Sequence, residues 1–199
     1  MGRRPKNKMN IAHDSFIALK KQIKIMKKII NTMLLLLAVA LSVPAYAQKD
    51  KPRVSPPESV TGMVNKATIT INYSSPSVKG RKIWGALVPY DTVWRAGANE
   101  ATTFQTDKDL LIGTQLLPAG KYGFFLIPGK TGQWVAIFNK VPNQWGAFKY
   151  DKTQDQIRVN AEMHTQNTVQ EMLTYKIASD GFSLTWENVT VFIPAQQNR

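Results

Sequence analysis

The 199-residue chain contains no cysteine. This absence excludes disulfide bonds, thiol catalysis, cysteine-ligated zinc and lipid attachment through a cysteine. Histidine is nearly absent too, because His164 is the only one after residue 47, and no Gly-x-Ser-x-Gly segment is present to place a serine nucleophile beside a base. We therefore expect His164 to be a surface or edge residue, and we expect no metal and no other cofactor.

The sequence is also poor in hydrophobic runs that are long enough to cross a membrane. One apolar run, Leu34 to Leu41, follows Lys27 and Lys28 and precedes a small-x-small site that ends at Ala47. It is shorter than the roughly 20 residues of a membrane span, and its flanks are typical of a secretory signal peptide over residues 26–47. An uncleaved anchor is the alternative. We expect a periplasmic or secreted protein that meets the membrane only through this cleaved segment.

Residues 1–25 lie upstream of the predicted signal peptide and are basic. They are either an upstream extension, with the true start at Met26, or an unusually long basic n-region. Nine of the 26 Lys and Arg residues, but one of the 13 acidic residues, precede Gln48, so the net charge falls from +13 to +5 in the remainder. No run of basic residues survives there, which argues against a nucleic-acid partner.

Helical periodicity is missing from the rest of the chain, which shows short alternating segments instead. In TITINY (68–73), apolar residues occupy every second position, which predicts a half-buried strand. Similar signals occur at TTFQT (102–106), DLLIGTQLL (109–117), YGFFLI (122–127), QWVAIF (133–138), QIRVNAEM (156–163), EMLTYKIA (171–178), FSLTW (182–186) and VTVFI (189–193). Turn residues separate them, and Gly113-Thr114 predicts a hairpin.

This pattern predicts an all-β fold of about nine strands. We expect a single β-sandwich domain over residues 67–195, of jelly-roll or immunoglobulin-like type. Residues 48–66 begin with a charged stretch that contains three prolines, so we expect them to be an extended lead-in. At most, one helical turn is expected in 82–96 or in 142–150.

Two long irregular loops, residues 74–101 and 139–155, interrupt the strands. Long connections in a compact domain often have a function, and these are rich in aromatic and basic residues. They supply the candidate ligand-binding residues, which are Arg81, Trp84, Trp94, Arg95, Asn99, Glu100 and Trp145.

The candidate residues allow several interpretations. Arg95 either forms ion pairs with Asp91 or Glu100 and fixes the loop, or faces a ligand. Asp91 and Glu100 would be the acid and base of a saccharide-acting hydrolase or lyase. Trp84 and Trp145 each precede a glycine and either expose a flat face to a sugar ring or pack in a satellite core.

Three blocks of the sequence resemble a known family. They are PSVKGRKIWGALVPYDTVWRAGANEATT (76–103), LPAGKYGFFLIPG (117–129) and WGAFKYDKTQDQIRV (145–159). Together they closely resemble exported bacterial proteins catalogued as domain of unknown function 2911, over about residues 52–194. The resemblance implies a signal peptide and one β-rich domain, and it implies no catalytic residues. The family commonly has arginine at the position of Ser75, so this chain lacks that charge.

We expect a binding module that holds a small polar ligand, a glycan or an envelope partner where the two loops meet. The saccharide-acting enzyme is one alternative. A structural or assembly protein with no small ligand is another, and it would present a flat apolar patch instead of a pocket. The sequence does not determine the oligomeric state.

Overall fold

The computed structural model describes the backbone of residues 8–41 and 52–198. The chain forms two compact units, Met1–Lys51 and Pro52–Arg199. The first contains α1 (Lys8–Leu41), which includes the apolar run of the predicted signal peptide. Within the described ranges, no helix is long and apolar enough to cross a membrane. The predicted cleavage site after Ala47 lies outside the described residues, so the signal peptide stays a prediction.

The second unit is built from nine strands, which confirms the predicted all-β class. The strands are β1 (Pro57–Val64), β2 (Ala67–Ser74), β3 (Thr102–Thr106), β4 (Leu110–Ile112), β5 (Gln115–Leu117), β6 (Gly120–Ile127), β7 (Trp134–Asn139), β8 (Asp155–Ala178) and β9 (Gly181–Gln197). One turn of 3-10 helix, η1 (Lys152–Gln154), precedes β8. No helix forms in 82–96 or 142–150, although each contains a hydrogen-bonded turn, from Ala86 N–H to the Ile83 carbonyl and from Tyr150 N–H to the Ala147 carbonyl.

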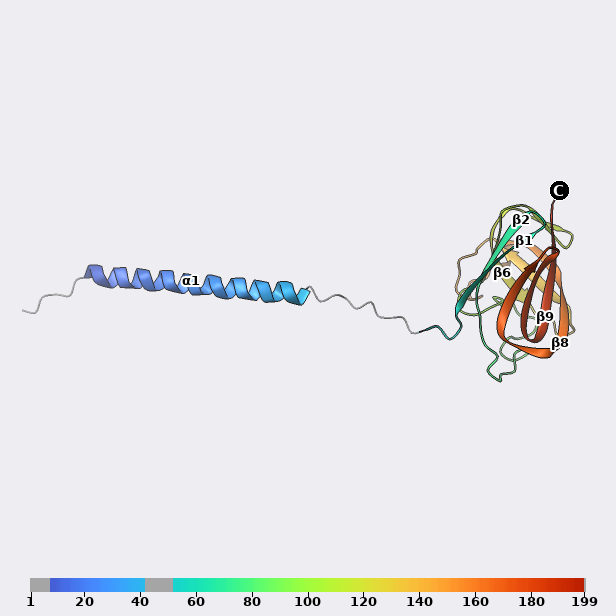
Figure 1. The fold of residues 1–199 in the computed structure, drawn as a ribbon, viewed down its shortest axis with the longest axis horizontal. Coiled ribbons are helices and arrows are strands. Elements are labelled where there is room, and N and C mark those ends of the chain that lie inside the picture. Colours follow the sequence, from blue (N-terminus) through green and yellow to red (C-terminus); the bar gives the residue numbers. More distant parts are fainter. Residues whose placement is uncertain (1–7, 42–51, 199) are drawn as a thin grey trace, which may run out of the picture. The chain divides into compact units, whose positions relative to one another are not determined.

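All strand pairs are antiparallel, and the strand order is β1-β2-β3-β6-β7-β8-β9-β4-β5. The sheet curls on itself, with the long strands β8 and β9 side by side (Figure 1). Phe104 of β3 and Phe182 of β9 are therefore 5.0 Å apart between ring centroids, although three strands separate them in the sheet. The sheet encloses one core. Because hydrogen bonds join all nine strands in one order, the two-sheet sandwich stays a prediction.

The alternation in the sequence explains which side chains enter this core. Ile69 and Ile71 of β2 are fully buried, while Thr68 and Thr70, which alternate with them, are partly exposed. The predicted hairpin at Gly113-Thr114 is confirmed, since it joins β4 to β5. Gly113 has a φ of 57°, a conformation that glycine adopts without a steric penalty.

Strand β9 joins two segments that the sequence presents as separate strands. Its buried residues include Phe182, Leu184 and Trp186 in the first half, and Val189 and Val191 in the second. The buried residues have even numbers before Glu187 and odd numbers after it. Glu187 has a φ of 54° and lies where the pairing with β8 shifts register. Such an irregularity lets one strand continue while its buried face moves by one residue. Strand β8 likewise joins the two predicted segments 156–163 and 171–178.

The sheet begins ten residues before the predicted start of the domain. Residues 57–64 form β1, which pairs with β2 from Pro57↔Ser74 to Val64↔Ala67. Burial alternates from Val60 to Val64, but Gly62 takes one of the partly buried positions and Met63 is exposed, so the sequence shows no alternating apolar signal. Its place in the sheet comes from the turn at Asn65, whose φ of 53° suits a two-residue hairpin.

The two long loops pack on the outer face of β6 and β7. There, Phe125 and Ile137 form a second apolar cluster with Ala101 of the first loop. Ala147 and Tyr150 of the second loop pack against the same cluster. Burial of this face therefore positions both loops beside each other on the sheet.

Candidate functional site

The two long loops meet through backbone hydrogen bonds. Ala101 N–H donates to the Gln144 carbonyl at 2.9 Å, and Gly146 N–H donates to the Asn99 carbonyl at 3.0 Å. Trp94 also exchanges two backbone hydrogen bonds with Leu126 of β6, at 2.8 and 2.9 Å. The segment that contains most of the predicted site is therefore held both by the sheet and by the second loop.

A pocket of about 390 Å³ lies along the first loop, and no residue of the second loop lines it. We call it the loop-end pocket. Four of the seven predicted residues line it, namely Arg81, Trp94, Arg95 and Asn99. Lys79 and Trp186 also line it, whereas no aspartate or glutamate does. The pocket wall therefore has three cationic side chains and no acidic one.

Arg95 has no counter-charge in this pocket. No oxygen among the described residues accepts a hydrogen bond from its guanidinium group, and the Nε atom is buried. Burial lowers the pKa of Arg95, but an arginine stays protonated at neutral pH. A half-buried charge without a partner costs stability, so the fold alone does not explain this side chain.

The backbone beside Arg95 is held in a strained conformation. Ala96 has a φ of 52°, which is unfavourable for a residue with a Cβ atom. Its carbonyl accepts hydrogen bonds from the hydroxyl groups of Tyr175 at 2.8 Å and Thr102 at 3.0 Å. At Gly97, a Cβ atom would lie 2.9 Å from Thr102 Oγ1, so only glycine fits. These contacts fix the direction in which Arg95 leaves the backbone.

Trp94 and Trp186 form the apolar part of the pocket wall. Their rings stack with 6.0 Å between centroids and an interplanar angle of 17°. The indole N–H of Trp186 is buried and has no acceptor in the described part of the protein. The indole N–H groups of Trp84 and Trp134, which do not line this pocket, lack an acceptor in the same way, so the Trp186 donor does not by itself indicate a ligand.

Trp84 and Trp145 do not lie at the loop-end pocket. Trp84 is only 8 % exposed and belongs to the main core. Its ring lies 4.9 Å from that of Trp134, 5.7 Å from that of Trp94 and 5.9 Å from that of Trp186. Trp84 therefore exposes no flat face to a sugar, and the core interpretation holds for it. Trp145 is 58 % exposed and lines a different depression.

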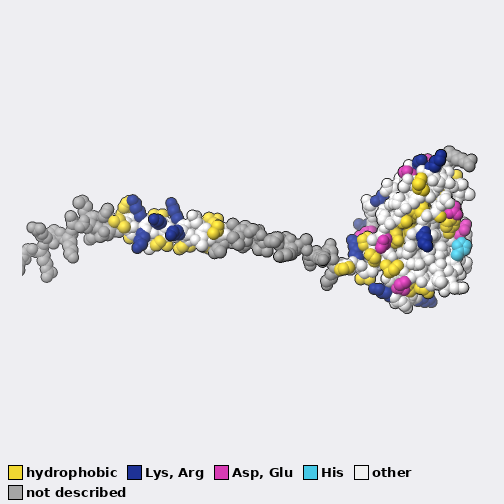
Figure 2. Space-filling model, viewed as in Figure 1, with side chains coloured by type: hydrophobic (Ala, Val, Ile, Leu, Met, Phe, Trp, Pro, Cys, Tyr) yellow, Lys and Arg dark blue, Asp and Glu magenta, His cyan; other side chains and the backbone are white. Residues whose placement is uncertain are grey.

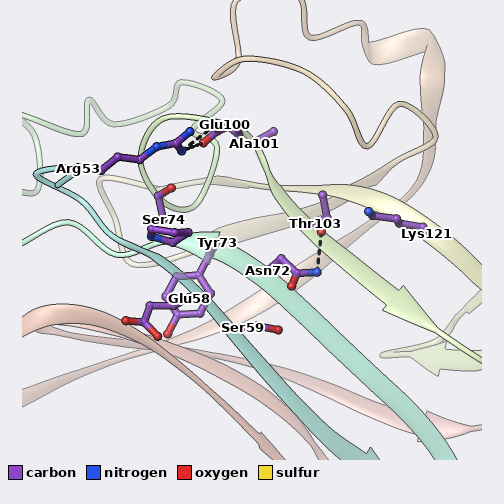
Figure 3. Close-up of a pocket in the computed structure, with 11 residues that line it drawn as sticks. Arg53, Glu58, Ser59, Asn72, Tyr73, Ser74, Glu100, Ala101, Thr103 and Lys121 are labelled. Carbon is purple, nitrogen blue, oxygen red and sulfur yellow. Dashed lines mark hydrogen bonds and ion pairs between the residues drawn. The ribbon is translucent and has the colours of Figure 1, made fainter. Parts of the chain in front are cut away.

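Glu100 pairs with Arg53, not with Arg95 (Figure 3). Arg53 Nη1 lies 2.9 Å from both carboxylate oxygens of Glu100. A hydrogen bond from its own backbone N–H and the contact with Arg53 lower the pKa of Glu100. The expected ion pairs between Arg95 and Asp91 or Glu100 are not formed, because the lead-in supplies Arg53 instead.

The lowered pKa also bears on the acid–base hypothesis. A general acid at neutral pH needs a raised carboxyl pKa, whereas that of Glu100 is lowered. Asp91 lines neither of the two depressions that Glu100 lines. Glu100 and Asp91 therefore lack the arrangement that paired-carboxylate catalysis requires.

His164 is exposed on β8, with its Nε2 atom 3.8 Å from Glu162, which confirms its predicted surface position. Within the described residues, no group of three or more His, Asp or Glu side chains could hold a metal ion. Acidic and basic side chains are interspersed on the face of the domain seen in Figure 2. That face presents no broad basic field of the kind that binds nucleic acid.

The family comparison agrees with the blocks singled out in the sequence. A family model described as "Protein of unknown function (DUF2911)" matches residues 55–195. The chain belongs to the DUF2911 family. No curated protein and no solved structure matches it.

In this DUF2911 domain, Ser75 has a structural contact. Its side chain is buried, and its hydroxyl group donates to the Leu173 carbonyl at 2.7 Å, while its backbone N–H donates to the Pro56 carbonyl at 2.8 Å. Ser75 thus ties the end of β2 to β8 and to the lead-in. It contributes no charge to the loop-end pocket.

Three residues at these sites were not among the candidates from the sequence. Lys79 lies in the first loop two residues before Arg81, and no pattern in the sequence distinguishes it from the nearby Lys82. Trp186 was correctly expected in the core, but one side of it also lines the pocket. Arg53 lies in the lead-in, 47 positions from Glu100, and no local pattern links the two. Tertiary contacts of the lead-in bring them together, such as the hydrogen bond from Asn99 Nδ2 to the Ser55 carbonyl at 3.2 Å.

Proposed function

We propose that this DUF2911 domain is a binding module whose loop-end pocket holds a small anion that has carboxylate or phosphate groups. The observation behind the proposal is Arg95, a half-buried guanidinium group with no acceptor among the described residues, in a pocket without acidic residues. Arginine binds carboxylate and phosphate groups through paired hydrogen bonds.

The rest of the pocket supports the same class of ligand. Lys79 and Arg81 add positive charge, and Trp94 and Trp186 supply an apolar wall. Arg81 already donates to the carbonyl groups of Ser77 and Val78, so its charge is only partly available. Arg95 should therefore contribute most to affinity, with Arg81 second.

Calorimetric titration with citrate and with inorganic pyrophosphate, at constant ionic strength, tests this proposal. The citrate arm reports on carboxylates and the pyrophosphate arm on phosphates. We expect at least one of the two to bind to the wild-type protein. Arg95→Gln should weaken that binding about 30-fold, or about 2 kcal/mol, the range of a charge-assisted contact. Arg81→Gln should weaken it about threefold, the range of a partly exposed charge.

Arg53→Gln is the matched control, since Arg53 is a charged arginine that does not line the pocket. It should leave the affinity within twofold of the wild-type value. Absence of binding by both probes at 10 mM would contradict the proposal. An affinity loss that is equal for Arg53→Gln and Arg95→Gln would also contradict it, because it would indicate general electrostatic attraction.

We also propose that the protein is exported, with residues 26–47 as its signal peptide. The support is the order of Lys27-Lys28, the apolar run Leu34–Leu41 and the small residues before Gln48. N-terminal sequencing of the protein recovered from outside the cytoplasm should give Gln48 as the first residue. Recovery of an intact chain from the membrane fraction would favour an uncleaved anchor.

A further inference from the structure

A second site lies on the outer surface of the sheet, apart from the loop-end pocket. Two depressions, of about 460 and 340 Å³, share the lining residues Glu100, Ala101 and Thr103. The first extends over β1, β2 and β3, and the second extends to Trp145 of the second loop. We call this pair of adjoining depressions the sheet groove.

The polar side chains of the groove come from neighbouring strands in register. Asn72 of β2 pairs with Ser59 of β1 on one side and with Thr103 of β3 on the other. Figure 3 shows Asn72 and Thr103 pointing toward each other, with Asn72 Nδ2 3.4 Å from Thr103 Oγ1. This row of amide and hydroxyl groups offers both donors and acceptors at a rigid surface.

The charges of the groove balance, in contrast to the loop-end pocket. Arg53 and Lys121 are basic, whereas Glu58 and Glu100 are acidic. Arg53 and Glu100 satisfy each other at 2.9 Å, so neither calls for a charged ligand. Glu58 and Lys121 form no ion pair with a described residue, but their charges cancel, so the groove has no net charge. A groove without net charge that is lined by amide and hydroxyl groups favours an uncharged, hydrogen-bonding ligand.

Trp145 supplies a flat aromatic surface at one end of the groove. It is 58 % exposed, although its backbone is fixed by an isolated bridge to Glu100. Next to it, Gly146 N–H donates to the Asn99 carbonyl at 3.0 Å. An exposed indole on a fixed backbone loses little conformational entropy when a ligand stacks on it.

We propose that the sheet groove binds an uncharged oligosaccharide. The face of one sugar ring would stack on Trp145, and the hydroxyl groups of the next rings would hydrogen-bond to Thr103, Asn72 and Ser59. This site is independent of the anion pocket, because Arg95 does not line it and its two basic side chains balance its two acidic ones.

Isothermal titration with four neutral hexasaccharides tests this inference. The probes are cellohexaose, xylohexaose, maltohexaose and chitohexaose. At least one should bind to the wild-type protein with a dissociation constant below 1 mM and shift the tryptophan emission to shorter wavelength. Trp145→Ala should weaken the binding at least tenfold and abolish the emission shift, and Asn72→Ala should weaken the binding about threefold.

Phe148→Ala is the matched control. Phe148 is another exposed aromatic residue of the second loop, at 84 %, and it lines neither depression of the groove. Its removal should leave the affinity within twofold. The inference is overturned if none of the four probes binds at 10 mM, or if Trp145→Ala binds as tightly as the wild-type protein. If no oligosaccharide binds but citrate or pyrophosphate still does, the sheet-groove inference is wrong and the proposal for the loop-end pocket is retained.

Discussion

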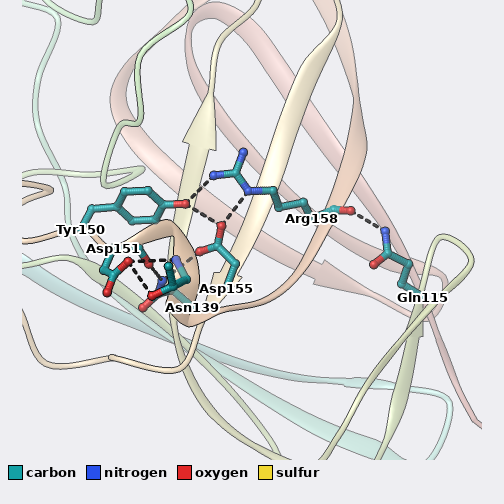
Figure 4. Close-up of polar contacts among 7 residues, drawn as sticks. Gln115, Asn139, Tyr150, Asp151, Asp155 and Arg158 are labelled. Atoms are coloured by element: carbon teal, nitrogen blue, oxygen red, sulfur yellow. Dashed lines mark hydrogen bonds and ion pairs between the residues drawn. The ribbon is translucent and has the colours of Figure 1, made fainter.

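Arg158 and Arg95 are both partly buried arginines, and they differ in what their guanidinium groups contact. Arg158 donates from Nε to Asp155 at 2.6 Å and from Nη2 to the Tyr150 hydroxyl group (Figure 4). Burial lowers the pKa of Arg158, but these two contacts outweigh burial and raise it overall. For Arg95, burial lowers the pKa and no described acceptor compensates. Stability accounts for the first arginine, whereas a ligand would account for the second.

The surroundings of Arg158 form a connected polar network, which we call the Asp155 network. Asp155 accepts hydrogen bonds from Arg158, from the Tyr150 hydroxyl group at 2.6 Å and from Asn139 Nδ2 at 2.8 Å. Asn139 also donates to the Asp151 carbonyl at 3.0 Å. These residues come from β7, β8 and the second loop, so the network fastens that loop to the sheet. Buried polar groups that satisfy one another rigidify a structure.

Asp155→Ala should have the largest effect on stability among the substitutions that distinguish the Asp155 network from the loop-end pocket. Its side chain is only 8 % exposed, and its loss leaves Arg158, Tyr150 and Asn139 without their acceptor. We expect the free energy of unfolding to fall by about 3 kcal/mol, the lower end of the range for a broken buried ion pair, because Arg158 is partly exposed. Urea denaturation followed by tryptophan fluorescence measures this change.

The matched control for that substitution is Asp151→Ala, which removes an exposed carboxylate that caps η1. It should cost about 1 kcal/mol, the usual cost of losing a cap. Citrate and pyrophosphate affinity should stay unchanged in both variants. If Asp155→Ala costs no more than Asp151→Ala, the network does not stabilise the loop as described.

A smaller effect is expected from Tyr150→Phe, and it should depend on pH. Burial, followed by the hydrogen bond to Asp155, raises the pKa of Tyr150 from 10.0 to about 12. Above pH 10 the unfolded chain loses the phenolic proton while the folded protein keeps it, so this contribution to stability is complete below pH 10 and disappears as the pH rises to 12. At pH 8 the variant should be less stable by about 1 kcal/mol, the usual value of one hydrogen bond.

Urea denaturation of both proteins from pH 8 to pH 11.5 gives the check. The difference between the wild-type protein and Tyr150→Phe should shrink above pH 10. A difference that stays constant over this range would mean that Tyr150 contributes through packing on Phe125, whose ring centroid is 5.2 Å away, and not through the network.

The sequence predicted the elements whose side chains alternate. Ile69 and Ile71 fixed the face of β2, and the turn at Gly113 fixed the β4–β5 hairpin. Strand β1 was missed because it lies at the edge of the sheet, and because Gly62 takes an inner position and Met63 an exposed one, which hides the alternation of burial from Val60 to Val64. The joining of segments into β8 and β9 was missed because local irregularities such as Glu187 change the alternation without ending the strand.

The candidate site was predicted only in part. Arg81, Trp94, Arg95 and Asn99 of the first loop line one pocket, but no residue of the second loop lines it, so this pocket does not lie where the two loops meet. The direction of each side chain could not be predicted, since it depends on tertiary packing. Trp84 packs in the core and Glu100 pairs with Arg53. No pattern in the local sequence indicates either contact.

The central claim is that the Arg95 guanidinium group binds a ligand and does not stabilise the fold. Urea denaturation of the wild-type protein and of Arg95→Met, each with and without 10 mM pyrophosphate or citrate at constant ionic strength, tests it most directly. Without an anion, Arg95→Met should be as stable as the wild-type protein or more so, because an apolar side chain of similar length avoids the cost of a half-buried charge. With an anion, only the wild-type protein should gain stability. Loss of more than about 1 kcal/mol in Arg95→Met without an anion, the value of an ordinary structural contact, together with no gain by the wild-type protein, would contradict the claim.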